Sequence, residues 1–181
     1  MRIIQQRYRL DDRIDPAFAE ASLVLAFAGR ESRDALARAL EAVRREAPAA
    51  PVVGCTTAGQ IMGTAVEDAA LVLTGVAFRR ARVRVSTLPI ESGAHSHAVG
   101  AGLAGELLED DLRHVLVFSD GIIVNGSELS RGLGAVVPAG VGVTGGLAGD
   151  GAAFQETWVW AGDDPQRRCV AAVGLYGHVE V

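Results

Sequence analysis

Two related stretches of the sequence contain residues whose types and spacing could bind a ligand. Residues 141–151 run from an apolar strand into a turn that holds four glycines and Asp150. Glycine permits positive φ and close approach of the backbone, so a turn of this kind can aim several N–H groups at one anionic atom. Residues 53–59 match residues 143–149, with Val, Ala and Gly at corresponding positions. This repetition favours a binding turn over the alternative, a tight connection between two strands.

A third stretch, residues 119–126, offers a hydroxyl, a carboxylate and an amide on one loop, from Ser119, Asp120 and Asn125. The loop precedes an expected helix, whose N-terminus adds N–H donors and a partial positive charge that favour an anion. The alternative is a turn in which Asp120 and Asn125 bond to their own backbone. The sequence alone leaves both interpretations open.

Together the three loops predict a ligand-binding site with no catalytic residue. Backbone N–H groups and hydroxyls would hold a carboxylate, and Asp120 or Asp150 would hold an ammonium group, so the site suits a zwitterion. Ligands of open α/β sheets bind outside the carboxyl ends of parallel strands, where we expect these loops. The predicted ligand-binding residues are Cys55, Thr56, Thr57, Ser119, Asp120, Asn125, Gly145, Gly146 and Asp150.

Alternative interpretations assign chemistry to single side chains. Cys55 could be the nucleophile of a hydrolase, with Asp120 or a distant histidine as its partner, although no histidine is near it in the sequence. Its other role is a small apolar side chain beside hydroxyls that bond a ligand or the loop, and Cys169 is expected in the core. The histidines show no metal-ligand spacing, so no metal site is expected. His178 could nevertheless be an axial ligand of a metal cofactor.

Composition argues against several classes of protein. The chain has 181 residues, of which 49% are hydrophobic, enough to form a sizeable core. Its net charge of −5 argues against nucleic-acid binding. All 17 basic residues are arginines, which excludes a P-loop lysine and a Schiff-base lysine. No signal peptide or membrane span is recognisable, so we expect a soluble cytoplasmic protein that binds neither nucleic acid nor a membrane.

The elements that position the loops occur twice. Each half is expected to contain a buried strand, a capped helix, a second buried strand parallel to the first, and a hairpin. The first half comprises strands 23–27 and 52–56, the helix from Ser32 to about Ala47, and the hairpin of 69–78 with 82–88. The second comprises strands 115–118 and 140–144, the helix capped by Ser127, and the hairpin of 154–161 with 169–176. Residues 1–15 are expected to form an edge strand or an arm. Trp158 and Trp160 face one side of their strand, as core or as the aromatic wall of a pocket.

This order predicts an internal duplication within one domain, residues 1–181. The pseudo-repeats cover residues 22–90 and 114–178, and a helix over residues 93–109 links them. We expect an α/β fold of mixed sheets from two βαβββ halves, with the sheets face to face and the helices outside. A single mixed sheet is the alternative. Equivalent loops of the two halves would then face one another around a pseudo-twofold axis.

Five segments of the chain resemble, in this order, the N-terminal domain of the FIST family: residues 52–59, 117–121, 125–126, 145–150 and 173–177. The resemblance extends over residues 22–181. It implies a non-enzymatic sensory module of prokaryotic signal transduction that binds a small polar ligand such as an amino acid. The partners that it implies are a C-terminal FIST domain or a signalling output protein.

The resemblance also implies alternatives. Some members of the family are reported as haem proteins that sense nitric oxide, and His178 or His114 would then be the iron ligand; otherwise no cofactor is expected. The family normally continues into a C-terminal FIST domain, whereas this sequence stops at Val181. We therefore expect a stand-alone input module, one component of a two-chain receptor, or a truncated chain. A further alternative is a structural module that docks a partner chain and has no pocket.

Overall fold

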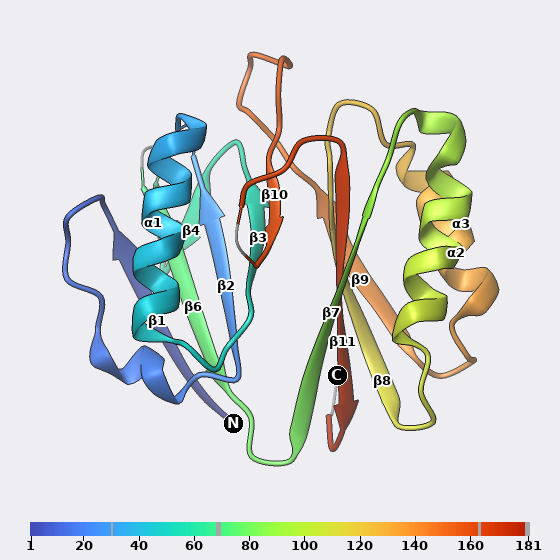
Figure 1. The fold of residues 1–181 in the computed structure, drawn as a ribbon, viewed down its shortest axis with the longest axis horizontal. Helices are drawn as coiled ribbons and strands as arrows, with labels where there is room; N and C mark the ends of the chain where they lie inside the picture. Colours follow the sequence, from blue (N-terminus) through green and yellow to red (C-terminus); the bar gives the residue numbers. More distant parts are fainter. Residues whose placement is uncertain (30, 68–69, 163, 180–181) are drawn as a thin grey trace.

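The computed structural model describes residues 1–29, 31–67, 70–162 and 164–179. The chain forms four layers, namely one helix, a five-stranded sheet, a four-stranded sheet and a pair of helices (Figure 1). Apolar side chains from both sheets, among them Val53, Phe118 and Val173, fill the space between the sheets. The two sheets therefore lie face to face with the helices outside, which confirms the expected α/β class and its layering.

The five-stranded sheet contains the first expected βαβ unit. Across the sheet the order is β1 (Arg2–Tyr8), β6 (Leu71–Ala77), β2 (Leu23–Ala28), β3 (Val52–Thr56) and β10 (Val159–Ala161). β2 and β3 run parallel and are joined by α1 (Arg33–Glu46), while the other neighbours are antiparallel. The hydroxyl of Ser32 accepts the N–H of Ala35 and caps α1, as the sequence predicts.

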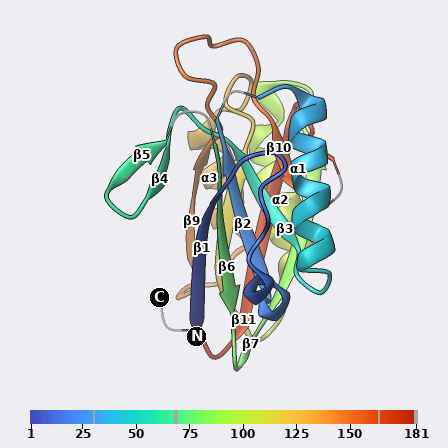
Figure 2. The same ribbon diagram turned by 90° about the vertical axis from the view of Figure 1, so that its left-hand side faces the viewer.

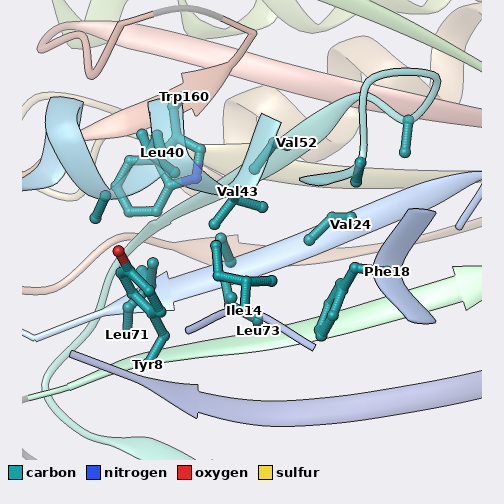
Figure 3. Packing of buried hydrophobic residues seen from close by; sticks show 14 of the residues in the cluster. Tyr8, Ile14, Phe18, Val24, Leu40, Val43, Val52, Leu71, Leu73 and Trp160 are labelled. Carbon is teal, nitrogen blue, oxygen red and sulfur yellow. The ribbon is translucent and has the colours of Figure 1, made fainter. Parts of the chain in front are cut away.

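Helix α1 covers the outer face of this sheet through an apolar stripe. Leu36, Leu40 and Val43 recur at helical spacing and are buried. Figure 3 shows Trp160 of β10 beside Leu40, and Phe18 of the short 3-10 helix η1 (Pro16–Glu20) at the other end of the cluster. The space between α1 and the sheet is thus closed by side chains from segments far apart in the sequence.

The four-stranded sheet contains the second βαβ unit. Its order is β7 (Ala81–Pro89), β11 (Cys169–Gly177), β8 (Leu112–Ser119) and β9 (Gly142–Leu147). β8 and β9 run parallel and are joined by α3 (Gly126–Val136). Before β8, the 3-10 helix η2 (Gly93–His95) leads into α2 (Ser96–Leu107). Helix α3 is capped by Asn125, whose side chain accepts the N–H of Glu128, so the expected cap at Ser127 is wrong.

Neither expected hairpin forms, because the two strands of each pair belong to different sheets. β6 lies between β1 and β2, whereas β7 crosses over and pairs with β11. On β7, Arg82 and Arg84 both pair with Glu109, a contact that the five-stranded sheet does not provide. β10 likewise pairs with β3 instead of β11. Each sheet therefore takes one strand from the other half of the chain. Ala69, the first residue expected in one strand, lies outside the described residues.

The strand order nevertheless repeats between the sheets. β6-β2-β3 in one sheet corresponds to β11-β8-β9 in the other, and the pair β2 and β3 is parallel like the pair β8 and β9. This is the arrangement that an internal duplication would produce. Common ancestry of the two halves, with the boundaries 22–90 and 114–178, stays a prediction.

Regular structure extends into two segments that follow the second parallel strand of each half or belong to its end. Residues 57–63 lead into a hairpin of β4 (Gln60–Met62) and β5 (Ala65–Glu67), which projects from the layers in Figure 2. Gly145 and Gly146 belong to β9 and not to a turn, since this strand continues to Leu147. The turn begins only at Ala148.

Glycines allow α2 and α3 to pack closely. A Cβ on Gly100 would lie 2.3 Å from the carbonyl oxygen of Leu129, and a Cβ on Gly132 would lie 2.1 Å from that of His97. Both contacts are with backbone, so a side chain at either position forces the helices apart. Gly134 is exposed and follows Gly132 by two residues on α3. A Cβ on Gly134 would meet nothing within 4 Å.

Gly132 and Gly134 on α3 give a matched pair of substitutions. We expect Gly132→Ala to lower the free energy of unfolding by about 1–3 kcal/mol, the usual cost of overpacking. Gly134→Ala should raise it by up to about 1 kcal/mol, because alanine has the higher helix propensity. Urea unfolding followed by circular dichroism measures both. Equal effects of the two substitutions would contradict the close helix packing described here.

Candidate functional site

The three loops expected to bind a ligand do meet, at the upper end of the molecule in Figure 1. The N–H of Gly149 donates to the carbonyl oxygen of Thr56 (2.9 Å), and the N–H of Ala148 donates to that of Ser119 (2.8 Å). The N–H of Gly121 donates to the Thr157 hydroxyl (3.0 Å). The ends of β3, β8 and β9 are therefore joined to one another by backbone hydrogen bonds.

The glycines at this junction make backbone contact possible. A Cβ on Gly121 would lie 1.9 Å from the carbonyl oxygen of Ala148, and a Cβ on Gly149 would lie 3.2 Å from the Ala58 nitrogen. The N–H groups of residues 148 and 149 bond to neighbouring loops. Packing of loop against loop is thus sufficient to explain these glycines.

The Asp120 side chain accepts hydrogen bonds from the backbone of its own loop and of a neighbouring segment. Its Oδ1 accepts the N–H groups of Ile122 and Ile123 (2.8 and 2.9 Å), and its Oδ2 accepts the N–H of Arg168 (3.1 Å). The side chain is 3% exposed. This is the backbone-bonded turn that the sequence left open as the alternative to a ligand contact.

Asp150 holds the following loop in a similar way. Its Oδ1 accepts the N–H of Phe154 (3.0 Å), and its Oδ2 accepts those of Gln155 and Glu156 (2.7 and 3.1 Å). These donors, with Gln155 the strongest, lower the pKa of the Asp150 carboxyl below its ordinary value. Unlike Asp120, Asp150 also lines a pocket.

The other predicted residues separate into several places. Cys55 faces the space between the sheets, and Asn125 is occupied as the cap of α3. The Thr57 hydroxyl donates to the Gly59 carbonyl oxygen (3.2 Å) and accepts from the Gln60 amide (2.8 Å). Ser119, Gly145 and Gly146 line a groove beside β9. Of the nine predicted residues, the structure thus brings Thr56 and Asp150 into one pocket and Ser119, Gly145 and Gly146 into a separate groove.

This pocket, which we call the acidic pocket, has a volume of about 340 Å³. It lies between the C-terminal end of β3, at Thr56, and the N-terminal end of α1, at Ser32. Sequence reasoning missed Glu31, Gln155 and Glu156, which belong to segments with no periodic pattern. The alternation of Trp158 with Trp160 did indicate an aromatic wall, and Trp158 provides it. The lining residues are Glu31, Ser32, Thr56, Asp150, Gln155, Glu156 and Trp158.

The acidic pocket combines carboxylates with hydrogen-bond donors. Glu31, Asp150 and Glu156 supply negative charge, and Arg167 partly balances it through an ion pair with Glu156 (2.9 Å). The Arg167 guanidinium also lies 5.7 Å from the centre of the Trp158 ring. The N-terminus of α1, whose N-cap Ser32 lines the pocket, contributes N–H groups without intrahelical partners and a partial positive charge. A ligand here meets both signs of charge.

The two cysteines are poorly placed for nucleophilic chemistry. Burial raises the pKa of the Cys55 thiol to about 12 and that of Cys169 to about 11, with Asp120 adding to the shift of Cys169. A nucleophilic cysteine requires the opposite shift, towards a thiolate at neutral pH. The geometry gives the hydrolase alternative no support.

The two histidines considered for haem lie in different surroundings. His114 is 6% exposed, and its Nε2 lies 2.8 Å from the Thr144 hydroxyl; burial lowers its pKa. His178 is an exposed side chain at a hollow that is lined by apolar residues, among them Phe78, and by Arg79 and Arg80. Among the described residues, no three His, Cys, Asp or Glu side chains are grouped to hold a metal ion. These surroundings give the haem alternative no specific support.

Comparison with known proteins gives one finding about the family. The family model described as FIST N domain matches residues 22–181 of the chain. No curated protein matches the chain. None of the helices in the part of the chain that the structure describes has the length and apolar character of a membrane span.

Proposed function

Since the chain belongs to the FIST N domain family and is therefore a sensory module of signal transduction, we propose that it senses a small zwitterion, such as an amino acid. The ligand binds in the acidic pocket. One observation carries this proposal: the pocket brings the carboxylates of Asp150, Glu156 and Glu31 together with the N-terminus of α1, where Ser32 lines it directly after Glu31. An ammonium group and a carboxylate on one small molecule satisfy both sides.

The ammonium end of the ligand is held by Asp150, Glu31 and Glu156. Asp150 is the fixed member, because three backbone N–H groups orient its carboxylate and keep its pKa low. It therefore remains ionised at neutral pH. A carboxylate can accept further hydrogen bonds beyond these three. Glu31, an exposed side chain, adds charge at the mouth of the pocket.

The carboxylate end is held by donors on the other side. The first turn of an α-helix leaves N–H groups without intrahelical partners, and Ser32 occupies that of Ala35. The N–H groups of Arg33 and Asp34 are the donors that α1 offers to an anion. The Thr56 hydroxyl accepts the N–H of Trp158 (3.0 Å), so its proton can be donated to the ligand.

The size of the pocket selects a small ligand. A volume of about 340 Å³ lies at the lower end of the range for small-molecule sites. The Trp158 side chain gives the aliphatic part of an amino acid an apolar wall. A non-enzymatic binding role agrees with the family and with the raised pKa values of both thiols.

Thermal unfolding of the protein in the presence of a panel of amino acids tests the proposal. We expect at least one amino acid to raise the melting temperature, because a ligand that binds the native state stabilises it. Glu31→Gln and Glu156→Gln should each reduce the shift. Glu128→Gln, which removes a carboxylate from the start of α3 outside the pocket, is the matched control and should leave the shift unchanged.

Two results would contradict the proposal. The first is the absence of a shift with every amino acid in the panel at millimolar concentration. The second is a shift with amines that lack a carboxylate equal to that with the corresponding amino acids, since the N-terminus of α1 would then have no role.

A further inference from the structure

The strand β9 has one unpaired edge. Its other edge pairs with β8 in parallel register from Gly142 to Leu147. Among the described residues no strand pairs with the outer edge. All six residues of β9 are exposed, including two large apolar ones, Val143 at 38% and Leu147 at 51%.

The other sheet edges carry features that prevent pairing with another chain. β1 contains Arg2 and Arg7, β7 contains Arg82 and Arg84, and β10 is only three residues long. Charged residues and short length are the usual protection of edge strands. The sequence of β9, Gly-Val-Thr-Gly-Gly-Leu, has no charge and no proline. Of these edges, β9 alone is left able to accept a strand.

An uncharged groove lies beside this edge. We call it the β9 groove; its volume is about 460 Å³. Leu129 and Leu133 of α3 line it together with Val143, Gly145 and Leu147 of β9. No charged side chain of the described residues lines it. An occupant with a charged group here would lose hydration without gaining a partner.

The other sheet shows how an equivalent edge is covered. There β10 pairs antiparallel with β3, and Trp160 lies opposite Gly54. A Cβ on Gly54 would lie 1.7 Å from the carbonyl oxygen of Ala26 on β2 and 3.1 Å from the Trp160 indole nitrogen, so a side chain here would meet both the neighbouring strand and the ring. The ring, 1% exposed, packs against Leu40 and Val43, and Figure 3 shows it above Leu40.

In the structure Gly145 on β9 is equivalent to Gly54 on β3, which shifts the sequence match of residues 53–59 to residues 143–149 by one position. Each is a glycine near the middle of the second parallel strand, and their partners on the first strand, Val117 and Ala26, both lie in cores beneath helices. Over Gly54 the space between helix and strand is filled by Trp160; over Gly145 it is the β9 groove. The two edges thus differ in that one has a covering strand and the other has none among the described residues.

We propose that β9 accepts an antiparallel β-strand from another polypeptide, and that this strand places a large aromatic or aliphatic side chain over Gly145. The residues of the incoming strand that face α3 are uncharged, to match the β9 groove. β10 defines the chemistry of the occupant, since its Val-Trp-Ala sequence covers the equivalent edge. The interaction is strand addition, in which backbone hydrogen bonds give affinity and alternate side chains give specificity. It is independent of the ligand in the acidic pocket.

A peptide with the sequence of residues 157–162, which contains no charged side chain, is the probe for this surface. It is added to the full chain labelled with ¹⁵N, and amide chemical shifts are followed. We expect shifts in β9 and in the part of α3 that contains Leu129 and Leu133. The same peptide with Trp160→Asp should bind at least about tenfold more weakly, because a charge would enter an apolar groove.

A substitution in the chain itself provides a second test of the peptide-binding experiment. Val143→Arg places a charge at the rim of the groove on an exposed position, and it should weaken peptide binding at least about tenfold. Val66→Arg is the matched control, since Val66 is 68% exposed on the distant β4–β5 hairpin. It should leave binding unchanged.

Three results would overturn the proposal. One is no shift in β9 at the solubility limit of the peptide. Another is binding that Val143→Arg leaves unchanged. The third is a dimer that forms without peptide and is abolished by Val143→Arg, which would make a second copy of this chain the occupant.

Discussion

Replacing Trp160 with alanine is expected to lower the free energy of unfolding by about 3–5 kcal/mol, the range for a large aromatic side chain removed from a core. Trp160 is 1% exposed and closes the space between α1 and β3, against Leu40 and Val43. It is also the central residue of β10, a strand of only three residues, so its loss removes the main anchor of that strand. A loss of this size is a large fraction of the stability of a typical domain.

The control for this prediction is Phe154→Ala. Phe154 is 79% exposed, so its replacement should change the free energy of unfolding by no more than about 0.5 kcal/mol. Trp160→Phe should lie between the two, because the smaller ring fills less of the space but removes an indole N–H that has no hydrogen-bond partner among the described residues. Urea unfolding followed by far-UV circular dichroism measures all three. A Trp160→Ala effect as small as that of Phe154→Ala would show that the ring does not anchor β10.

Replacing Asp150 with asparagine is expected to have the second-largest effect, on stability and on its pH dependence. An amide offers one acceptor oxygen where the carboxylate offers two, so at least one of the three loop N–H groups is left unpaired. A hydrogen bond to a charged group contributes about 1.5–3 kcal/mol, and the lower figure is expected here because water can reach the N–H groups of the exposed residues 154–156. Because Asp150 also lines the acidic pocket, the variant should also bind the sensed zwitterion more weakly.

The sign of the pH dependence follows from the lowered pKa. N–H donors, that of Gln155 first, hold the folded-state pKa of Asp150 below the unfolded-state value. The carboxylate therefore contributes its full stability above the unfolded-state pKa, near 3.9 for aspartate, and loses it as the pH falls through the folded-state pKa. The difference between the native chain and Asp150→Asn should shrink with acidification over this window.

Urea unfolding at several pH values between neutrality and strong acid measures this difference. Asp110→Asn, at an exposed aspartate, is the matched control and should leave the pH dependence close to that of the native chain. If Asp150→Asn and Asp110→Asn behave alike at every pH, the hydrogen bonds of Asp150 do not hold the loop.

The sequence predicted the elements of the fold more reliably than their pairing. Continuous apolar runs indicated β2, β3 and β8 correctly, and the stripe of Leu36, Leu40 and Val43 indicated α1. Two alternating strands with a short connection could equally form a hairpin or cross between sheets. Nothing local distinguishes these outcomes, since the choice depends on distant partners such as Glu109 for β7 and Gly54 for β10.

The site was predicted in part. The prediction that strand-end loops of the two halves lie together agrees with the hydrogen bond from Gly149 to Thr56. The chemistry of individual residues was harder to infer, because an aspartate that bonds to its own loop and one that also faces a pocket look the same in sequence. Asp120 and Asp150 are such a pair. Glu31 and Glu156 enter the pocket only through the fold, since they lie far apart in the chain.

The exchange of strands between the sheets has a consequence for biosynthesis. β11 lies between β7 and β8, yet it follows all other strands in the sequence. While the chain emerges from the ribosome, β7 and β8 are synthesised before β11, the strand that pairs with both. In the same way β3 is synthesised before β10. Neither sheet can close before about residue 161, and the four-stranded one not before residues 169–177. The nascent polypeptide therefore exposes apolar strands until residues 169–177 have been synthesised.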